Sequence, residues 1–163
     1  MRIDKDIAKT ILKFQASAPV NVVGLVKFLG LEVWESHDLP EGIAGKIFRD
    51  KKHGGSLQYS IVVRAEDSRL RKRFTVAHEL AHYILHRHLF TESLIDDALY
   101  RSNLSTRIEA QANGLAADLL MPWHLLSRMS ERSIAGLAEL FEVSEQAMRI
   151  RLNQTQREIP IER

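Results

Sequence analysis

Two histidines and a glutamate near the middle of the chain have the spacing of a zinc-binding catalytic motif. His78, Glu79 and His82 form the pattern H-E-x-x-H within an apolar stretch that favours a helix. Residues four apart lie on one face of a helix, so both imidazoles can bind one zinc ion. The carboxylate of Glu79, beside the first ligand, can then accept a proton from a water at the zinc. The pattern therefore predicts a zinc site with Glu79 as general base.

A hydrolytic zinc site also needs a third protein ligand and an open position for water. His88 stands where the third histidine of a longer zinc motif would be. That motif needs a glycine that turns the chain back, and Leu85 occupies its place here. His86 is about 80° further round the helix than His78, at about 100° per residue. Its position indicates instead a histidine at the helix end, near the negative end of the dipole.

Glu109 is the favoured third ligand. It lies early in the next helical pattern, expected over about residues 105–120, and Asn113 follows one turn later on nearly the same face. This spacing is the layout of proteases that combine H-E-x-x-H with a later E-x-x-x-D/N pattern. In that layout the glutamate binds the metal, and the side-chain carbonyl oxygen, here that of Asn113, accepts the Nδ1–H of a ligand histidine. The alternatives are an acid that stabilises a helix N-terminus and an ordinary surface amide.

The elements around these residues predict a mixed fold. Apolar periodicity and turn signals separate helices from short segments rich in Val, Ile and aromatic residues. Helices are expected over 4–17, 22–29, 68–88, 105–120, 123–130, 133–141 and 144–153, and strands over 31–35, 43–49 and 57–63. The last two strands are expected to form a hairpin around Gly54-Gly55.

Composition limits the class of protein. The 163 residues suit one domain, and the chain contains no cysteine, which excludes disulfides, thiolate metal sites and a cysteine nucleophile. A formal charge of +2 does not suggest a general nucleic-acid binder. No apolar stretch reaches the 18 or so residues of a membrane span, and the N-terminus lacks the apolar core of a signal peptide. We expect a soluble cytoplasmic protein without a membrane partner.

Two longer patterns resemble those of the ImmA/IrrE-type metallopeptidases. They are RxRFTxAHExAHxxLH over Arg71–His86 and ExxANxxAAxLLMP over Glu109–Pro122. The strand segments Gly42–Ile47 and Ser60–Arg64 also fit, and the resemblance covers roughly residues 20–152. It implies a zincin-like α+β fold, with a small, mainly antiparallel sheet beside the H-E-x-x-H helix and further helices at the C-terminal end.

The resemblance also implies a site and a function. Zinc would be bound by His78, His82 and Glu109, with Glu79 as the base. The protein would be an endopeptidase that inactivates a helix-turn-helix repressor, often encoded nearby, of a mobile element, a stress response or a toxin–antitoxin-like module. The competing hypothesis is a metal-stabilised module that binds a repressor or DNA without hydrolysis. The larger regulators of this family carry a C-terminal sensor domain, and we expect this chain to be too short to hold one.

Several finer features remain open from the sequence. The donor that stabilises the oxyanion could be Tyr59, Tyr83, Tyr100 or His124, and we select Tyr100 and His124 as the candidates. An extended substrate could pair with the edge of the sheet beside residues 57–63. Gly114 costs the second long helix about 1 kcal/mol relative to alanine, which close helix packing would explain.

The C-terminal segment has helix-turn-helix character. We expect residues 1–130 to form the peptidase unit with its N-terminal helices, residues 131–153 to pack on it as part of one structural unit, and residues 154–163 to be a flexible tail. A recognition helix should present several basic or amide groups, and the second helix offers Gln146, Arg149, Arg151 and Asn153. We prefer a helix pair packed on the peptidase, with a protein rather than DNA as partner.

Overall fold

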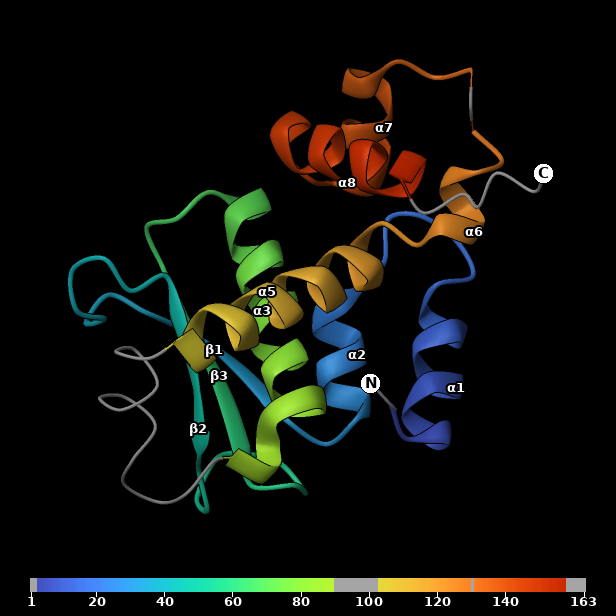
Figure 1. Ribbon diagram of the computed structural model, residues 1–163. Coiled ribbons are helices and arrows are strands. Elements are labelled where there is room, and N and C mark those ends of the chain that lie inside the picture. Colours follow the sequence, from blue (N-terminus) through green and yellow to red (C-terminus); the bar gives the residue numbers. More distant parts are fainter. Residues whose placement is uncertain (1–2, 90–102, 130, 158–163) are drawn as a thin grey trace.

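The structure, a computed structural model, describes residues 3–89, 103–129 and 131–157. Its elements in chain order are α1 Lys5–Phe14, α2 Val22–Phe28, β1 Glu32–Ser36, β2 Gly45–Arg49, β3 Tyr59–Arg64, α3 Arg69–His86, η1 Arg87–Leu89, α5 Asn103–Leu120, α6 Trp123–Leu126, α7 Ile134–Phe141 and α8 Glu145–Arg157. Figure 1 shows the sheet on one side of α3, α5 crossing α3, and α7 and α8 lying together above α5. The predicted α+β fold class is confirmed.

Local sequence explains where the helix that carries H-E-x-x-H begins and ends. The hydroxyl of Ser68 accepts a hydrogen bond from the backbone N–H of Arg71 and so caps α3. The helix ends at His86 and is followed by the single 3-10 turn of η1. At the other end of the chain, α8 extends to Arg157, four residues beyond the predicted helix. The rest of the predicted tail lies outside the described residues.

The sheet has the order β1-β3-β2, so β3 lies in its centre. β2 and β3 form the predicted antiparallel hairpin, with Ile47 opposite Ile61. β1 pairs with β3 in parallel, which makes the sheet mixed rather than mainly antiparallel. After β1 the chain passes to β2 at the opposite edge of the sheet, and the hairpin then leads to β3 in the centre. Because the chain reverses its direction twice between β1 and β3, these two strands run parallel. The prediction that an extended substrate pairs with a sheet edge at residues 57–63 is therefore wrong, because the free edges of the sheet belong to β1 and β2.

Small side chains bring α3 and α5 close together. Ala77 and Ala81 on α3, and Ala112 and Ala116 on α5, are all fully buried members of one hydrophobic core. Alanine side chains allow two helix backbones to approach, and this close packing brings polar residues on the flanks of both helices within reach of each other. Gly114 plays no part in this contact, since a Cβ added there would meet no atom within 4 Å. The packing explanation for this glycine is wrong.

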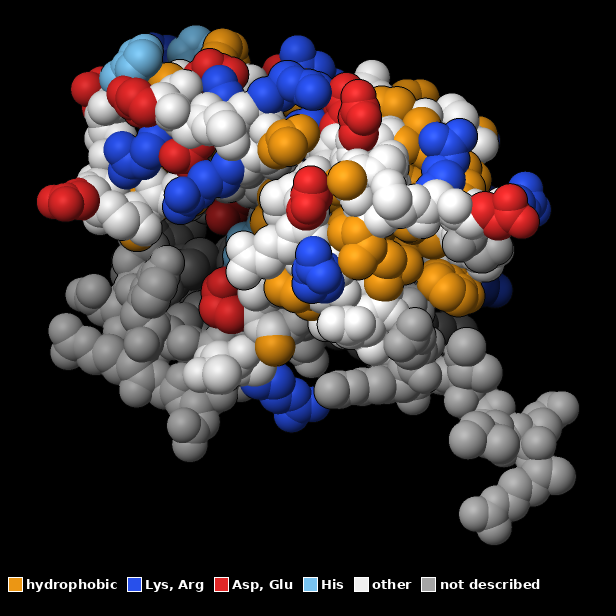
Figure 2. All heavy atoms as spheres, turned by 90° about the horizontal axis from the view of Figure 1, so that it is seen from above, with side chains coloured by type: hydrophobic (Ala, Val, Ile, Leu, Met, Phe, Trp, Pro, Cys, Tyr) orange, Lys and Arg blue, Asp and Glu red, His pale blue; other side chains and the backbone are white. Residues whose placement is uncertain are grey.

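The C-terminal helices pack on the same core. Phe141 of α7 and Met148 of α8 are fully buried in it. Arg151 of α8 is buried as well, donating from Nε to the backbone carbonyl of Met121 (3.0 Å) and pairing with Asp118 (2.6 Å). It is therefore committed to the fold rather than available to DNA. Figure 2, which views the end where α7 and α8 lie, shows acidic, basic and hydrophobic side chains interspersed. None of the described helices combines the length and apolar character needed to cross a bilayer.

Candidate metal centre

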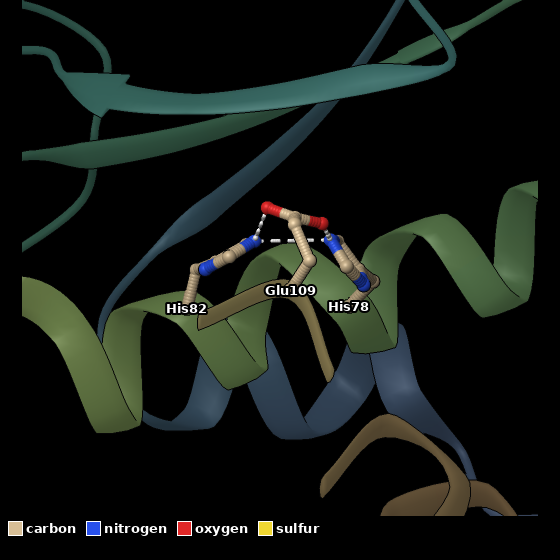
Figure 3. Close-up of side chains that lie close together, drawn as sticks. All are labelled: His78, His82 and Glu109. Atoms are coloured by element: carbon tan, nitrogen blue, oxygen red, sulfur yellow. Dashed lines mark hydrogen bonds and ion pairs between the residues drawn. The ribbon is translucent and has the colours of Figure 1, made fainter. Parts of the chain in front are cut away.

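His78, His82 and Glu109 converge at the crossing of α3 and α5. The Glu109 carboxylate lies 3.1 Å from Nε2 of His78 through one oxygen and 3.0 Å from Nε2 of His82 through the other. The two Nε2 atoms are 3.0 Å apart. Figure 3 shows the carboxylate reaching over both imidazoles, with the strands of the sheet passing on its far side. Of the three candidates for a third ligand, Glu109 is the one that meets the histidine pair.

The electrostatics of this cluster reflect its mixed burial. Burial lowers the pKa of His78, but hydrogen bonding to Glu109 and the nearby carboxylate charges outweigh it, and the pKa is raised. Hydrogen bonds from the two histidines hold the pKa of Glu109 well below its ordinary value, so this carboxylate is ionised. The side chain of Glu109 is 49% exposed, whereas those of His78 and His82 are 16% and 12% exposed. The cluster therefore faces solvent through its carboxylate.

A side-chain amide orients the first histidine. Nδ1 of His78 lies 2.9 Å from Oδ1 of Asn113, one turn beyond Glu109 on α5. An amide oxygen only accepts, so His78 donates from Nδ1–H, which leaves its Nε2 as the nitrogen that a metal ion at the cluster would bind. The predicted partnership of Asn113 with a ligand histidine is thus present in the geometry.

The second histidine has a partner that sequence reasoning missed. Nδ1 of His82 lies 3.0 Å from Nδ1 of His86, and Nε2 of His86 lies 3.0 Å from Oε1 of Gln111. Burial lowers the pKa of His86, which favours its neutral form. His86 is the last residue of α3, as expected, and its ring also contacts His82 and Gln111. A signal was present in the sequence, because His86 follows His82 by one turn.

Glu79 lies between the cluster and strand β2. Its side chain is largely buried, and burial raises its pKa above the ordinary value for a glutamate, although the neighbouring histidines and the backbone of Ile47 oppose this rise. A recess of about 300 Å³ opens beside it, lined by residues 42–45 and by the face of α3 that carries His78 and Glu79. A carboxylate of raised pKa next to a recess is the arrangement expected of a general base.

The other predicted site residues lie elsewhere. His88 is exposed in η1, away from the histidine pair. Nε2 of His124 hydrogen-bonds the backbone carbonyl of Gln15, whose side chain in turn bonds the carbonyls of Asp118 and Leu119. That places His124 at the opposite end of α5 from Glu109, about 14 Å along the helix at ~1.5 Å per residue. The prediction of His124 as an oxyanion donor is wrong, because the turn at Pro122 after α5 places its side chain against the C-terminal end of α1 and not beside Glu109.

Two of the tyrosine candidates, Tyr59 and Tyr83, contact each other. Tyr83 packs its ring edge-on against Tyr59, with centroids 5.1 Å apart. Tyr100 lies outside the described residues.

The donor set fits a divalent cation. Both imidazoles direct Nε2 at the point that the Glu109 carboxylate faces, and the candidate ligand atoms lie within 4.8 Å of one another. A metal ion bound between these atoms would take the place of the protons that the two histidines donate to Glu109. Two ligands of a tetrahedral zinc ion with bonds of 2.0–2.1 Å are about 3.3 Å apart, close to the separations here. His78, His82 and Glu109 are therefore able to hold a metal ion, with no further protein ligand needed.

Comparison with known proteins agrees with this chemistry. The sequence profile of the IrrE N-terminal-like domain, Peptidase_M78, matches residues 30–153, which is more than half of the chain. The chain belongs to this family. The resemblance to ImmA/IrrE-type metallopeptidases is thereby confirmed, and membership in a metal-dependent peptidase family supports a peptidase. No match is found among curated proteins.

A solved structure shares the fold of this IrrE-like chain. It is described as a Mycobacterium tuberculosis transcriptional regulator, and it aligns with a TM-score of 0.62 and 17% sequence identity. The alignment covers 96% of this chain and 49% of that protein, so the chain spans about half the length of its structural neighbour. At this identity the likeness concerns the fold alone.

Proposed function

We propose that this chain is a zinc-dependent endopeptidase with His78, His82 and Glu109 as metal ligands and Glu79 as general base. The observation that carries the proposal is the convergence of two oriented Nε2 atoms and one ionised carboxylate beside a buried glutamate. Family membership supports a peptidase, and the donor set of two imidazoles and one carboxylate suits zinc.

The residues divide the chemistry between them. A bound zinc ion would polarise the scissile carbonyl and lower the pKa of a water. Glu79 takes the proton of the attacking water and passes it to the leaving amine nitrogen. Asn113 holds His78 in its binding tautomer throughout.

Strand β2 supplies a binding edge for an extended substrate. The N–H of Arg64 bonds the carbonyl of Ala44, and the N–H of Asp50 bonds the carbonyl of Gln58, so these positions face β3. Because successive residues of a strand point their backbone groups to opposite sides, the groups of Gly45 and Ile47 face the free edge. The backbone of Ile47 is near enough to Glu79 to lower the pKa of its carboxyl, which places that edge beside the proposed general base. A substrate segment added here would lie across the cluster.

The substrate that we propose is a helix-turn-helix repressor encoded by a neighbouring gene, which would place the reaction in the cytoplasm. The test is to incubate the zinc-loaded protein with the purified product of that gene and to identify fragments by mass spectrometry. Site-specific cleavage is expected from the wild type. Glu79→Gln should retain zinc and lose cleavage by at least about 100-fold, the contribution of a general base.

The alternative hypothesis makes the opposite prediction. A non-hydrolytic module that acts by binding a repressor or DNA would relieve repression equally well as the wild type and as Glu79→Gln. A transcription reporter read with both proteins, alongside the fragment analysis, separates the two functions. Unchanged relief of repression by Glu79→Gln, without fragments, would overturn the endopeptidase.

A further inference from the structure

A chain of two hydrogen bonds leads from the back of His82 to helix α5. Nδ1 of His82 meets Nδ1 of His86 at 3.0 Å, and Nε2 of His86 meets Oε1 of Gln111 at 3.0 Å. His86 is 4% exposed, so water does not compete freely for its ring nitrogens. Its ring lies on the side of His82 that faces away from Glu109, which bonds Nε2 of His82 instead.

The direction of these bonds decides what His82 offers to the cluster. Gln111 accepts through its oxygen, so His86 donates from Nε2–H and its Nδ1 is the nitrogen that accepts from His82. His82 then donates from Nδ1–H, which leaves its Nε2, beside Glu109 and His78, as the nitrogen that a metal ion would bind. If the bonds ran the other way, His82 would carry its proton on Nε2, where it would block a metal ion.

We propose that His86 and Gln111 are positioning residues, which hold His82 in the Nδ1–H tautomer and fix the direction of its Nε2 toward the metal. The proposal rests on the metal centre described under Proposed function and deepens it. His86 thus contributes to metal binding without being a ligand, although the sequence had made it a candidate for one.

The arrangement around His78 supports this role. There Asn113 accepts the Nδ1–H directly at 2.9 Å. Gln111 does the same for His82 through the ring of His86. Both amides belong to α5, which also provides Glu109, so one helix supplies the ligand carboxylate and fixes both ligand imidazoles. Partners of this kind change metal affinity by about 10–100-fold when they are removed.

The test is zinc affinity, measured by competition with a chromophoric chelator. His86→Leu removes the acceptor and is expected to weaken zinc binding about 10–100-fold. His86→Asn places Oδ1 near the position of the imidazole Nδ1, and it is expected to regain most of that affinity. His88→Leu is the matched control, because it is the same substitution two residues away at an exposed histidine outside the chain of bonds, and it should bind zinc as the wild type does.

A second readout follows the proton itself. Two-bond ¹⁵N–¹H spectra of the zinc-free protein, at about pH 8 where an ordinary histidine is neutral, report which nitrogen of His82 carries hydrogen. We expect His82 to carry hydrogen on Nδ1 in the wild type and in His86→Asn, and a smaller share of Nδ1–H in His86→Leu. A purely structural role of His86 would change the unfolding midpoint without changing this tautomer.

The outcomes separate this proposal from the metal centre on which it rests. If the wild type binds no zinc, or if His82→Ala binds it equally well, the metal centre fails and the positioning role fails with it. If zinc binding depends on His82 but His86→Leu keeps both wild-type affinity and tautomer, only the positioning role is overturned. Should His86→Leu not fold, Gln111→Leu decides the question, since Gln111 is only half-buried. Weaker zinc binding in that variant supports the role, and unchanged binding overturns it.

Discussion

The guanidinium of Arg73 in α3 hydrogen-bonds the backbone carbonyl of Glu142, the left-handed residue that ends α7, at 3.1 Å. The same side chain donates to the carbonyl of Val20, just before α2, at 3.0 Å. One partly buried cation on the helix of the H-E-x-x-H motif therefore donates to carbonyls from both the N-terminal and the C-terminal parts of the chain. The turn between α7 and α8 is thereby attached to the helix that carries the candidate site.

Replacing Arg73 should destabilise the fold far more than replacing Arg69, although both pair with Glu142. Arg73→Met leaves the carbonyls that Arg73 hydrogen-bonds without this donor, and we expect a loss of about 2 kcal/mol in the free energy of unfolding. The side chain of Arg69 is 66% exposed and makes only a surface ion pair, so Arg69→Met should cost less than about 1 kcal/mol. Urea unfolding followed by circular dichroism measures both, and equal losses would contradict this account.

Two glycines should respond oppositely to alanine. A Cβ at Gly45 would lie 2.5 Å from Cγ2 of Thr75 and 2.8 Å from the carbonyl oxygen of Val62, so it would force β2 and α3 apart. We expect Gly45→Ala to destabilise by about 1–3 kcal/mol. At Gly114 a Cβ meets nothing within 4 Å, and Gly114→Ala should stabilise the helix by up to about 1 kcal/mol. Thermal unfolding decides the signs, and a stabilising Gly45→Ala would show that the contact between β2 and α3 is looser than described.

The hairpin between β2 and β3 should respond to acid through Asp50. Hydrogen bonds from the backbone N–H of His53 and from the hydroxyl of Ser60 lower its pKa below the ordinary 3.8. A carboxylate whose pKa is lower in the folded state stabilises the fold above its unfolded pKa, and this contribution is lost as the pH falls through the folded pKa.

The corresponding variant is Asp50→Asn, compared with the wild type. The urea midpoint of the wild type should exceed that of Asp50→Asn by a constant amount between about pH 5 and 7, and the difference should shrink below about pH 4. A difference that does not depend on pH would show that the charge of Asp50 contributes nothing.

Metal removal should destabilise the protein through Glu109. An ion that binds only the folded state at 100 times its dissociation constant stabilises it by about 2.7 kcal/mol, so zinc should raise the unfolding temperature and a chelator should reverse the effect. Glu109→Gln keeps the shape of the side chain and removes its charge, and we expect most of the shift to disappear. Glu139→Gln changes an exposed acid on α7 and should respond to zinc as the wild type does. An undiminished shift in Glu109→Gln would contradict a role for this carboxylate in binding.

The sequence could predict the parts of the site that depend on helical spacing. His78 and His82 are four residues apart, and Glu109 and Asn113 repeat that interval on the next long helix, so each pair had to share a face once its helix formed. The apolar patterns of both helices, with buried alanines at Ala77 and Ala112, indicated that these faces would meet.

Features that depend on how distant elements meet were beyond sequence reasoning. The strand lengths and turn signals predicted a hairpin, but nothing in them shows that β1 pairs with β3 rather than β2. His124 seemed available because it follows the site helix in sequence, and only the path of the chain past α1 removes it. The link from His86 to Gln111 joins residues 25 positions apart, and no local pattern predicts such a pair.

The uneven exposure of the three ligand candidates sets an order for metal exchange. The carboxylate of Glu109 is about half exposed, while both imidazoles are enclosed and held from behind by α5 or by His86. An ion that leaves this centre would part from Glu109 first and from the histidines last, and an arriving ion would meet them in the reverse order. Chelators and competing metals would therefore act at the carboxylate side, and the rate of zinc loss would follow the motion of one glutamate side chain.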